Sequence, residues 1–251
     1  MSGNYESRAL VLGIALVVFL LAASAASPDL EYLLDLDDYE NFVTHPLLTY
    51  VSATPWLAFS WKAVWPLLQQ SVLGVVEPVI SLLRAALVVA WPNAMSGAGG
   101  ARATYLVGCA VHASNAVQVA LLLSEVENAG ILFQASRIRT EVAATSATVS
   151  PAGATPVAAC EAGPSRCAIA AATLTWALHP LRGEVLGWLS CQGYLFATAF
   201  SLAAVRASVA SLCSGRSGSN GGSFGHWRGF LWFTLACGCK AVLQLICCTF
   251  N

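Results

Sequence analysis

The chain has 251 residues, of which 57% are hydrophobic and only 10% are charged. A water-soluble domain carries roughly 25% charged residues, so this composition excludes an ordinary soluble domain and predicts an integral membrane protein. The net charge of −1 provides no basic surface for nucleic acid. Nine cysteines lie scattered through apolar segments without a C-x-x-C pair, which argues against a secreted disulfide scaffold and against a zinc ribbon.

The N-terminal segment, residues 1–26, predicts a membrane-inserted helix. Arg8 precedes an apolar run from Ala9 to Ala26, which is close in length to the roughly 20 residues that span a bilayer. The small residues Ala23–Ala25 also resemble a signal-peptidase site. A retained signal anchor and a cleaved signal peptide therefore both fit, and we favour the anchor.

Residues 27–55 predict an acidic juxtamembrane segment. Six of the thirteen acidic residues lie between Asp29 and Glu40. The segment lacks the glycine and the terminal glutamate spacing of an EF-hand loop, so a solvated surface segment fits better than a calcium site. We expect no bound metal ion and no other cofactor.

Residues 56–133 predict the first half of a bundle of membrane helices. The first part of this region is rich in tryptophan, which favours the membrane–water interface. Gln70–Trp91 and Thr104–Ser124 are each long and apolar enough to span a bilayer. At 100° per residue, the polar residues of each span fall on one side of its helix. Such polar faces should turn toward protein rather than toward lipid.

We call the predicted set of inward-facing polar residues the polar seam. Lipid cannot satisfy their donors and acceptors, so they should form hydrogen bonds between helices or line a polar pocket. Glu77 is expected to be the counter-charge of Arg84 or Lys240 and to lie at the depth of Gln118. No catalytic residue is expected, because His112 is the one histidine deep in a span. The polar seam consists of Glu77, Arg84, His112, Asn115, Gln118, Gln192 and Lys240.

Residues 134–167 predict a disordered loop. The segment is rich in Ala, Thr, Ser and Pro and loses the hydrophobic period of the helices before it. Cys160 and Cys167 lie in this loop and would form a disulfide if that side of the membrane is oxidising.

Residues 168–251 predict the second half of the bundle. Ala168–Leu178 is too short to span and should be interfacial or re-entrant, whereas Val185–Val205 and Gly229–Phe250 are long enough to cross. A ridge of small residues at four-residue spacing would let another helix approach closely. This small-residue ridge consists of Gly193, Ala197 and Ser201.

The predicted fold is an all-α, multi-pass transmembrane helical bundle with about five spans. By the positive-inside rule, Arg8, Arg102 and the loop between Arg206 and Arg228 lie in the cytosol. The N-terminus is then inside and the loop of residues 125–184 is outside. The third and fourth spans therefore run in opposite directions in this prediction.

Two patches resemble helices of the transmembrane protein 254 family, which are small multi-pass proteins of unassigned activity. The first patch is CAVHASNAVQVALLL, with His112 among small and polar neighbours, and the second is GEVLGWLSCQGYLFATAFSL. The matching residues of the second patch are Trp188, Gln192, Ser201 and Leu202. The resemblance implies a multi-pass membrane protein and assigns no reaction to it.

These observations predict a non-enzymatic assembly or interaction subunit of an internal membrane, in the endoplasmic reticulum or elsewhere on the secretory route. Its expected partners are membrane lipid and, through the small-residue ridge, other proteins or a second copy. The alternative is a small lipid-active enzyme or carrier that uses the region of Glu77, His112 and Lys240. An enzyme or carrier needs this region hydrated and open, whereas a structural bundle needs it closed and paired.

Overall fold

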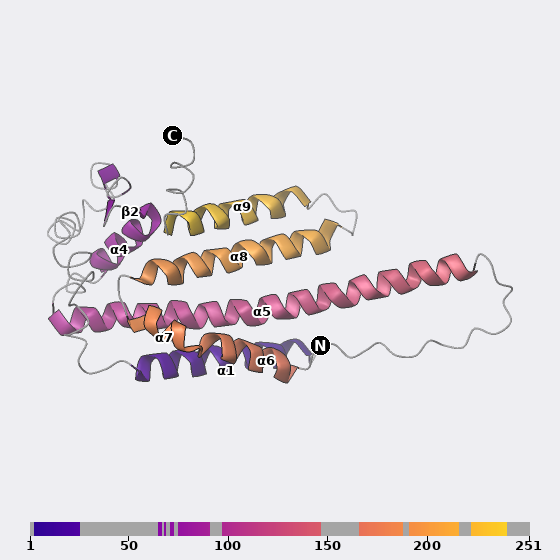
Figure 1. Ribbon diagram of the computed structural model, residues 1–251, viewed down its shortest axis with the longest axis horizontal. Coiled ribbons are helices and arrows are strands. Elements are labelled where there is room, and N and C mark those ends of the chain that lie inside the picture. Colours follow the sequence, from indigo (N-terminus) through magenta and orange to yellow (C-terminus); the bar gives the residue numbers. More distant parts are fainter. Residues whose placement is uncertain are drawn as a thin grey trace.

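The computed structural model describes residues 3–25, 65–66, 68, 71–72, 75–90, 97–146, 166–187, 191–215 and 222–239. Almost all of these residues are helical, so the prediction of a helical fold is confirmed for the described part of the chain. The elements are α1 (Gly3–Ser24), β1 (Ser71–Val72), β2 (Val75–Val76), α4 (Pro78–Ala90), α5 (Gly97–Ser146), α6 (Arg166–Ala177), α7 (Pro180–Gly187), α8 (Gln192–Gly215) and α9 (Gly222–Cys239). In Figure 1 the long helices lie side by side along the longest axis of the molecule.

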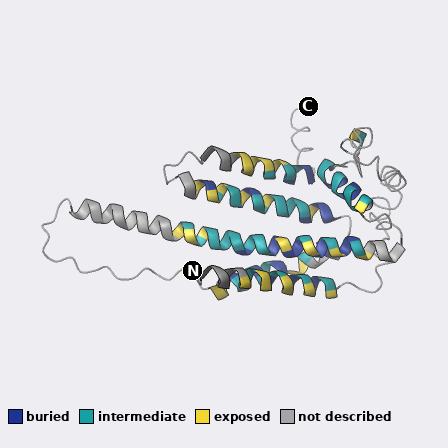
Figure 2. Ribbon diagram, turned by 180° about the vertical axis from the view of Figure 1, so that it is seen from behind, coloured by how far each residue is buried: buried dark blue, intermediate teal, exposed yellow. Residues whose placement is uncertain are grey.

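The central element is α5, which contacts α1, α6, α7 and α8. Its sequence is rich in Ala, Leu and Val and contains no proline, so nothing interrupts the helical hydrogen bonds over 50 residues. Ala113, Ala116 and Ala120 recur at three- and four-residue spacing and form one apolar cluster with Val18 of α1 and Ile169 of α6. Among the described side chains of α5, the buried ones lie between Thr104 and Ala120, where these helices cover it (Figure 2).

Helices α5 and α8 run in the same direction. Gln192 at the start of α8 bonds to Thr104 near the start of α5, and Arg206 farther along α8 bonds to Glu125 farther along α5. The prediction that the third and fourth spans are antiparallel is therefore wrong. It failed because it allowed no return of the chain between them, whereas α6 and α7 run back along α5 (Figure 1).

Helices α8 and α9 form an antiparallel pair whose backbones approach closely at glycines. A Cβ atom placed on Gly193 would lie 3.0 Å from the carbonyl oxygen of Cys239, and one placed on Gly229 would lie 3.6 Å from that of Ala204. Of the predicted small-residue ridge, Gly193 is buried, Ala197 is half-buried and Ser201 is exposed. Each four-residue step rotates a side chain by about 40°, so the third member has turned out of the contact.

Two predicted segments differ from the structure. Gln70–Trp91 is not one span, because β1 and β2 pair in register Ser71↔Val76 and only the 13 residues of α4 are helical. Several β-branched valines favour extended backbone there, and Pro78 occupies the first helical position, where its missing N–H costs nothing. The predicted loop 134–167 is helical up to Ser146 and again from Arg166, because its Pro and Gly residues lie between those two positions.

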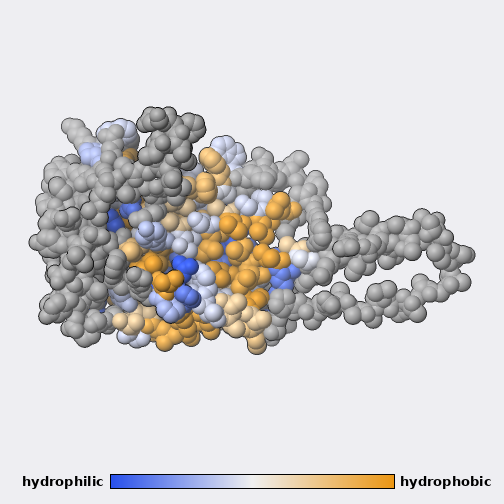
Figure 3. Space-filling view, in the orientation of Figure 1, coloured by the Kyte–Doolittle hydropathy of each residue, from blue (hydrophilic) through white to orange (hydrophobic). Residues whose placement is uncertain are grey.

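Two described helical segments are long and apolar enough to cross a membrane, Arg102–Gly130 of α5 and Gln192–Leu212 of α8. Ala9–Ser24 and Pro78–Leu87 are shorter apolar helices. The predicted final span lies partly outside the described residues, since α9 ends at Cys239. Figure 3 shows apolar side chains spread over the middle of the bundle surface.

Gly238 provides a test of the packing between α4 and α9. A Cβ atom at this position would overlap the side chain of Val79, so Gly238→Ala forces the two helices apart. We expect a net loss of stability, because overpacking costs about 1–3 kcal/mol and the helix propensity of alanine returns only about 0.5–1 kcal/mol.

The measurement is thermal unfolding of both variants in one detergent. Gly130→Ala in α5 is the matched control, because a Cβ atom there meets nothing within 4 Å. Equal melting temperatures for the two variants would contradict the close packing of α9 on α4.

Candidate functional site

Four buried polar side chains of α5 and α8 bond to backbone carbonyls of other helices. The hydroxyl of Tyr105 donates to the carbonyl of Ala22 in α1 at 2.6 Å. Asn115 donates through Nδ2 to the carbonyl of Leu195 in α8 at 2.9 Å, and Gln192 donates to the carbonyl of Thr104 at 2.7 Å. His112 of α5 also bonds to α6. Hydrogen bonds therefore join α5 to α1, α6 and α8, three of the four helices around it.

His112 closes the C-terminal end of α6. Its Nε2 atom lies 2.9 Å from the carbonyl oxygen of Ala177, the last residue of that helix. The carbonyl lacks its usual partner because α6 stops before Pro180 and the backbone N–H of Leu181 faces Nδ1 of His179 at 3.4 Å. Carbonyls at a helix end need donors from elsewhere, and His112 supplies one.

A stack of three side chains holds α6 and α7 against α5. The rings of His112 and Trp176 are stacked with centroids 5.8 Å apart. The Cζ atom of Arg182 in α7 lies over the ring of Trp176, 4.6 Å from the ring centroid, in a cation–π contact. The imidazole, the indole and the guanidinium therefore bridge both sides of the helix break.

Three buried polar atoms in this region have no hydrogen-bond partner in the described part of the chain. They are Nδ1 of His112, Oδ1 of Asn115 and Oγ1 of Thr173. A carbonyl can only accept, so neutral His112 carries its proton on Nε2 and leaves Nδ1 as an acceptor. Two of the three atoms therefore require a donor, and the third is a hydroxyl that can donate or accept.

The seam residues on α4 and directly before it lie apart from His112. Glu77 and Arg84 are buried, as is Ser81 of α4, and an oxygen of Glu77 lies 3.7 Å from a Cβ atom placed on Gly193 of α8. Glu77 therefore lies at the N-terminal end of α8, which contacts α5 near Gly108. That level is about 15 Å along α5 from Gln118 at ~1.5 Å per residue. The predicted depth match with Gln118 is wrong.

The remaining seam residues have mixed positions. Gln192 is buried and Gln118 is half-buried. Lys240 lies outside the described residues, so its predicted pairing with Glu77 stays a prediction. Cys160 also lies outside them, and Cys167 is an exposed free thiol at the start of α6.

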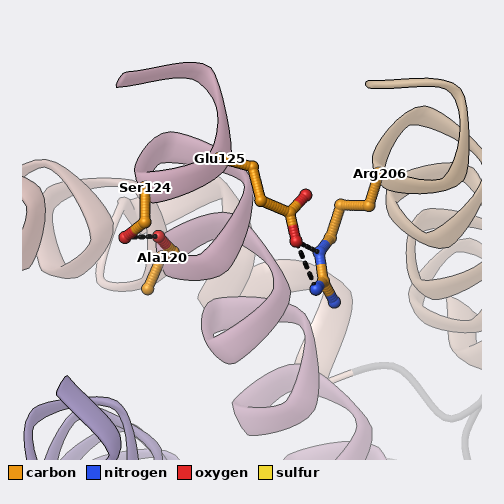
Figure 4. Close-up of polar contacts among 4 residues, drawn as sticks. All are labelled: Ala120, Ser124, Glu125 and Arg206. Carbon is orange, nitrogen blue, oxygen red and sulfur yellow. Dashed lines mark hydrogen bonds and ion pairs between the residues drawn. The ribbon is translucent and has the colours of Figure 1, made fainter. Parts of the chain in front are cut away.

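The sequence analysis missed an ion pair between α5 and α8. Two nitrogens of Arg206 contact Oε1 of Glu125, at 2.6 and 3.1 Å, and both side chains are about one-third exposed. Figure 4 shows the two side chains pointing toward each other across the gap between the helices. The parallel arrangement of α5 and α8 creates this pair, because it places their C-terminal parts together.

In this arrangement the buried polar groups join helices to one another. His112 is 1% exposed, and its Nε2 atom is already committed to a carbonyl. Within the described ranges, no group of three His, Cys, Asp or Glu residues could hold a metal ion.

No protein-family model, no curated protein and no solved structure matches this chain. The resemblance to the transmembrane protein 254 family therefore stays a prediction.

The bond between Tyr105 and Ala22 can be tested by removing one oxygen. Tyr105→Phe leaves a buried carbonyl at the end of α1 without its donor, which should lower stability by about 1–3 kcal/mol. The measurement is thermal unfolding in one detergent. The control is Thr198→Val, because that exposed hydroxyl bonds only within α8, to Tyr194. A control loss as large as that of Tyr105→Phe would show that the hydroxyl of Tyr105 does not join the helices.

The ion pair can be tested by a double-mutant cycle with Glu125→Gln and Arg206→Met. We expect a coupling of about 0.5–1 kcal/mol, at the lower end for contacting residues because both side chains are partly exposed. The comparison cycle pairs Glu127→Gln with Arg206→Met and should be additive, since Glu127 lies about 200° around α5 from Glu125. Additivity in both cycles would rule out the ion pair as an interhelical contact.

Proposed function

We propose that this chain is a multi-pass membrane protein of an internal membrane that acts as a non-enzymatic assembly or interaction subunit. This proposal rests on the hydrogen bonds that the buried donors form with other helices. Tyr105, His112, Asn115 and Gln192 each bond to a backbone carbonyl of a neighbouring helix. Side chains committed in this way stabilise a closed bundle, whereas catalysis or transport requires polar groups that remain available to a substrate.

The outer faces of the helices support placement in lipid. Leu12, Leu16 and Leu20 lie one turn apart on α1, and each is more than half exposed. On α9 the exposed large side chains are Trp227, Phe230, Leu231 and Phe233. Soluble monomers rarely expose contiguous apolar faces of this kind. Only 17% of the apolar stretch of α8 is buried inside the protein, unlike the core helix of a soluble domain.

The packing of α1 supports a retained anchor as the first of about five spans. Ile14 and Val18 are buried against α5, and the carbonyl of Ala22 accepts from Tyr105. Cleavage after Ala25 would release α1 and expose an apolar face of α5. We therefore expect the purified chain to retain residues 3–25, and intact-mass measurement will show whether it does. A mass that lacks this segment would overturn the anchor.

The proposed role is tested by alkaline extraction of membranes followed by native mass spectrometry. The chain should stay in the membrane pellet and should then appear with bound lipid, a protein partner or a second copy. Release into the alkaline supernatant would overturn the membrane placement. A purified monomer without lipid or protein partners would overturn the assembly role.

A second candidate is a small lipid-active enzyme or carrier. The unpartnered acceptors on His112 and Asn115 favour it, because a hydroxyl-bearing ligand could satisfy them. The separation of Glu77 from His112 disfavours the version that uses both residues. A single lipid species retained by the wild type and lost in His112→Phe, which keeps the ring that stacks on Trp176, would favour this candidate.

A further inference from the structure

The parallel arrangement of α5 and α8 constrains the path of the chain between them. Both helices begin at the same end of the bundle, where Gln192 of α8 bonds to Thr104 of α5. Farther along, Arg206 of α8 bonds to Glu125 of α5, so both helices run toward the other end. The chain therefore has to travel back along the bundle between Ser146 and Gln192. The described segments on this path are α6 and α7 (Figure 1).

Helices α6 and α7 follow α5 in the antiparallel direction over most of the bundle. Ile169 of α6 shares an apolar cluster with Ala120, and Ala177 bonds to His112. Leu186 of α7 shares a second cluster with Tyr105. The two helices contain 12 and 8 residues, which correspond to about 30 Å of helix, the thickness of a bilayer's hydrocarbon core.

We propose that α6 and α7 together form one broken crossing of the membrane, an inference that rests on the proposed membrane placement. Each helix alone is too short to cross. As one unit they carry the chain back across the membrane between α5 and α8. The connections formed by residues 147–165 and 216–221 therefore lie on the same face of the membrane. This arrangement replaces the predicted one, in which those two regions lie on opposite faces.

At the break in this crossing residues 178–181 are exposed, whereas the open carbonyl of Ala177 is buried. Backbone polar groups at membrane depth need partners from the protein, and this carbonyl has one. His112 donates to the open carbonyl of Ala177, and the charge of Arg182 lies over the ring of Trp176. Leu178 and His179, which link the two helices, are the only residues between their ends.

The arginines decide which face is cytosolic. Seven arginines lie at or next to the end that carries the two connections. The opposite end has Arg84 and Arg102 on described elements and at most Lys62 and Lys240 outside the described residues, since Arg182 lies at the break over Trp176. By the positive-inside rule the richer end faces the cytosol. Disulfides are rare in that compartment, so Cys160 and Cys167 are expected to be thiols there. The arginines at or directly next to the richer end are Arg8, Arg137, Arg139, Arg166, Arg206, Arg216 and Arg228.

The experiment inserts one recognition site for a specific protease into the full-length chain, in three separate variants. The positions are residues 150–155, residues 217–219 and residues 30–35, which follow α1. Membranes are isolated as sealed vesicles with the cytosolic face outward, and each variant is digested with and without detergent. Cleavage in detergent establishes that each site is accessible to the protease once the membrane is opened. Resistance to alkaline extraction is measured in parallel, so that a failure of the membrane placement is distinguished from a failure of the topology.

We expect the sites in 150–155 and 217–219 to be cut in sealed vesicles, and the site in 30–35 to be cut only after detergent is added. Cleavage of just one of the first two sites in sealed vesicles, in a chain that resists extraction, would overturn the broken crossing. Protection of both, together with cleavage at 30–35, would support the broken crossing and overturn the assigned orientation. Release of the chain by alkali would overturn the membrane placement and this inference with it.

Discussion

The fold depends on satisfying backbone carbonyls that are buried away from water. Helix α1 ends at Ser24 and α6 ends at Ala177, and the carbonyls in the last turn of a helix need donors from outside it. Tyr105 and His112 of α5 supply the missing donors. In the proposed lipid setting each unsatisfied group would cost several kcal/mol, so these two bonds fix which face of α5 the ends of α1 and α6 occupy.

Small side chains allow this arrangement. The alanine face of α5 lets α1 and α6 approach closely enough for side chains of α5 to reach their backbones. Glycines in α8 and α9 let α8, α9 and α4 approach one another closely. A larger side chain at Ala113 or Ala116 would increase the distance across which His112 has to reach Ala177. Close packing and hydrogen bonding are therefore one requirement rather than two independent contributions, as is common for helices associated in lipid.

The sequence predicts well the features that depend on helical period and composition. The apolar character of α5 and the burial of His112, Asn115 and Gln192 follow from a 3.6-residue repeat in a chain with few charges. The bonding partners could not be predicted, because a backbone carbonyl is the same for every residue type. The direction of α8 was also mispredicted, since loop charges were balanced in 125–184 and the short helices α6 and α7 were not joined into one return path. The split of the polar seam follows from the same error, because the seam was placed by depth along helices of assumed direction.

The long sequence separation between donors and acceptors has a consequence for synthesis. His112 lies 65 residues before Ala177, and Asn115 lies 80 residues before Leu195. At roughly 5–20 residues per second, α5 emerges about 3 to 16 s before its acceptors exist. If the chain enters a membrane as proposed, its imidazole and amide groups need other partners during that interval, such as water inside the insertion machinery. The connection between α8 and α9 is only residues 216–221, so that pair can form as soon as it is made. The bonds of α5 therefore form in the order in which α6 and α8 are made, whereas the contact between α8 and α9 needs no such delay.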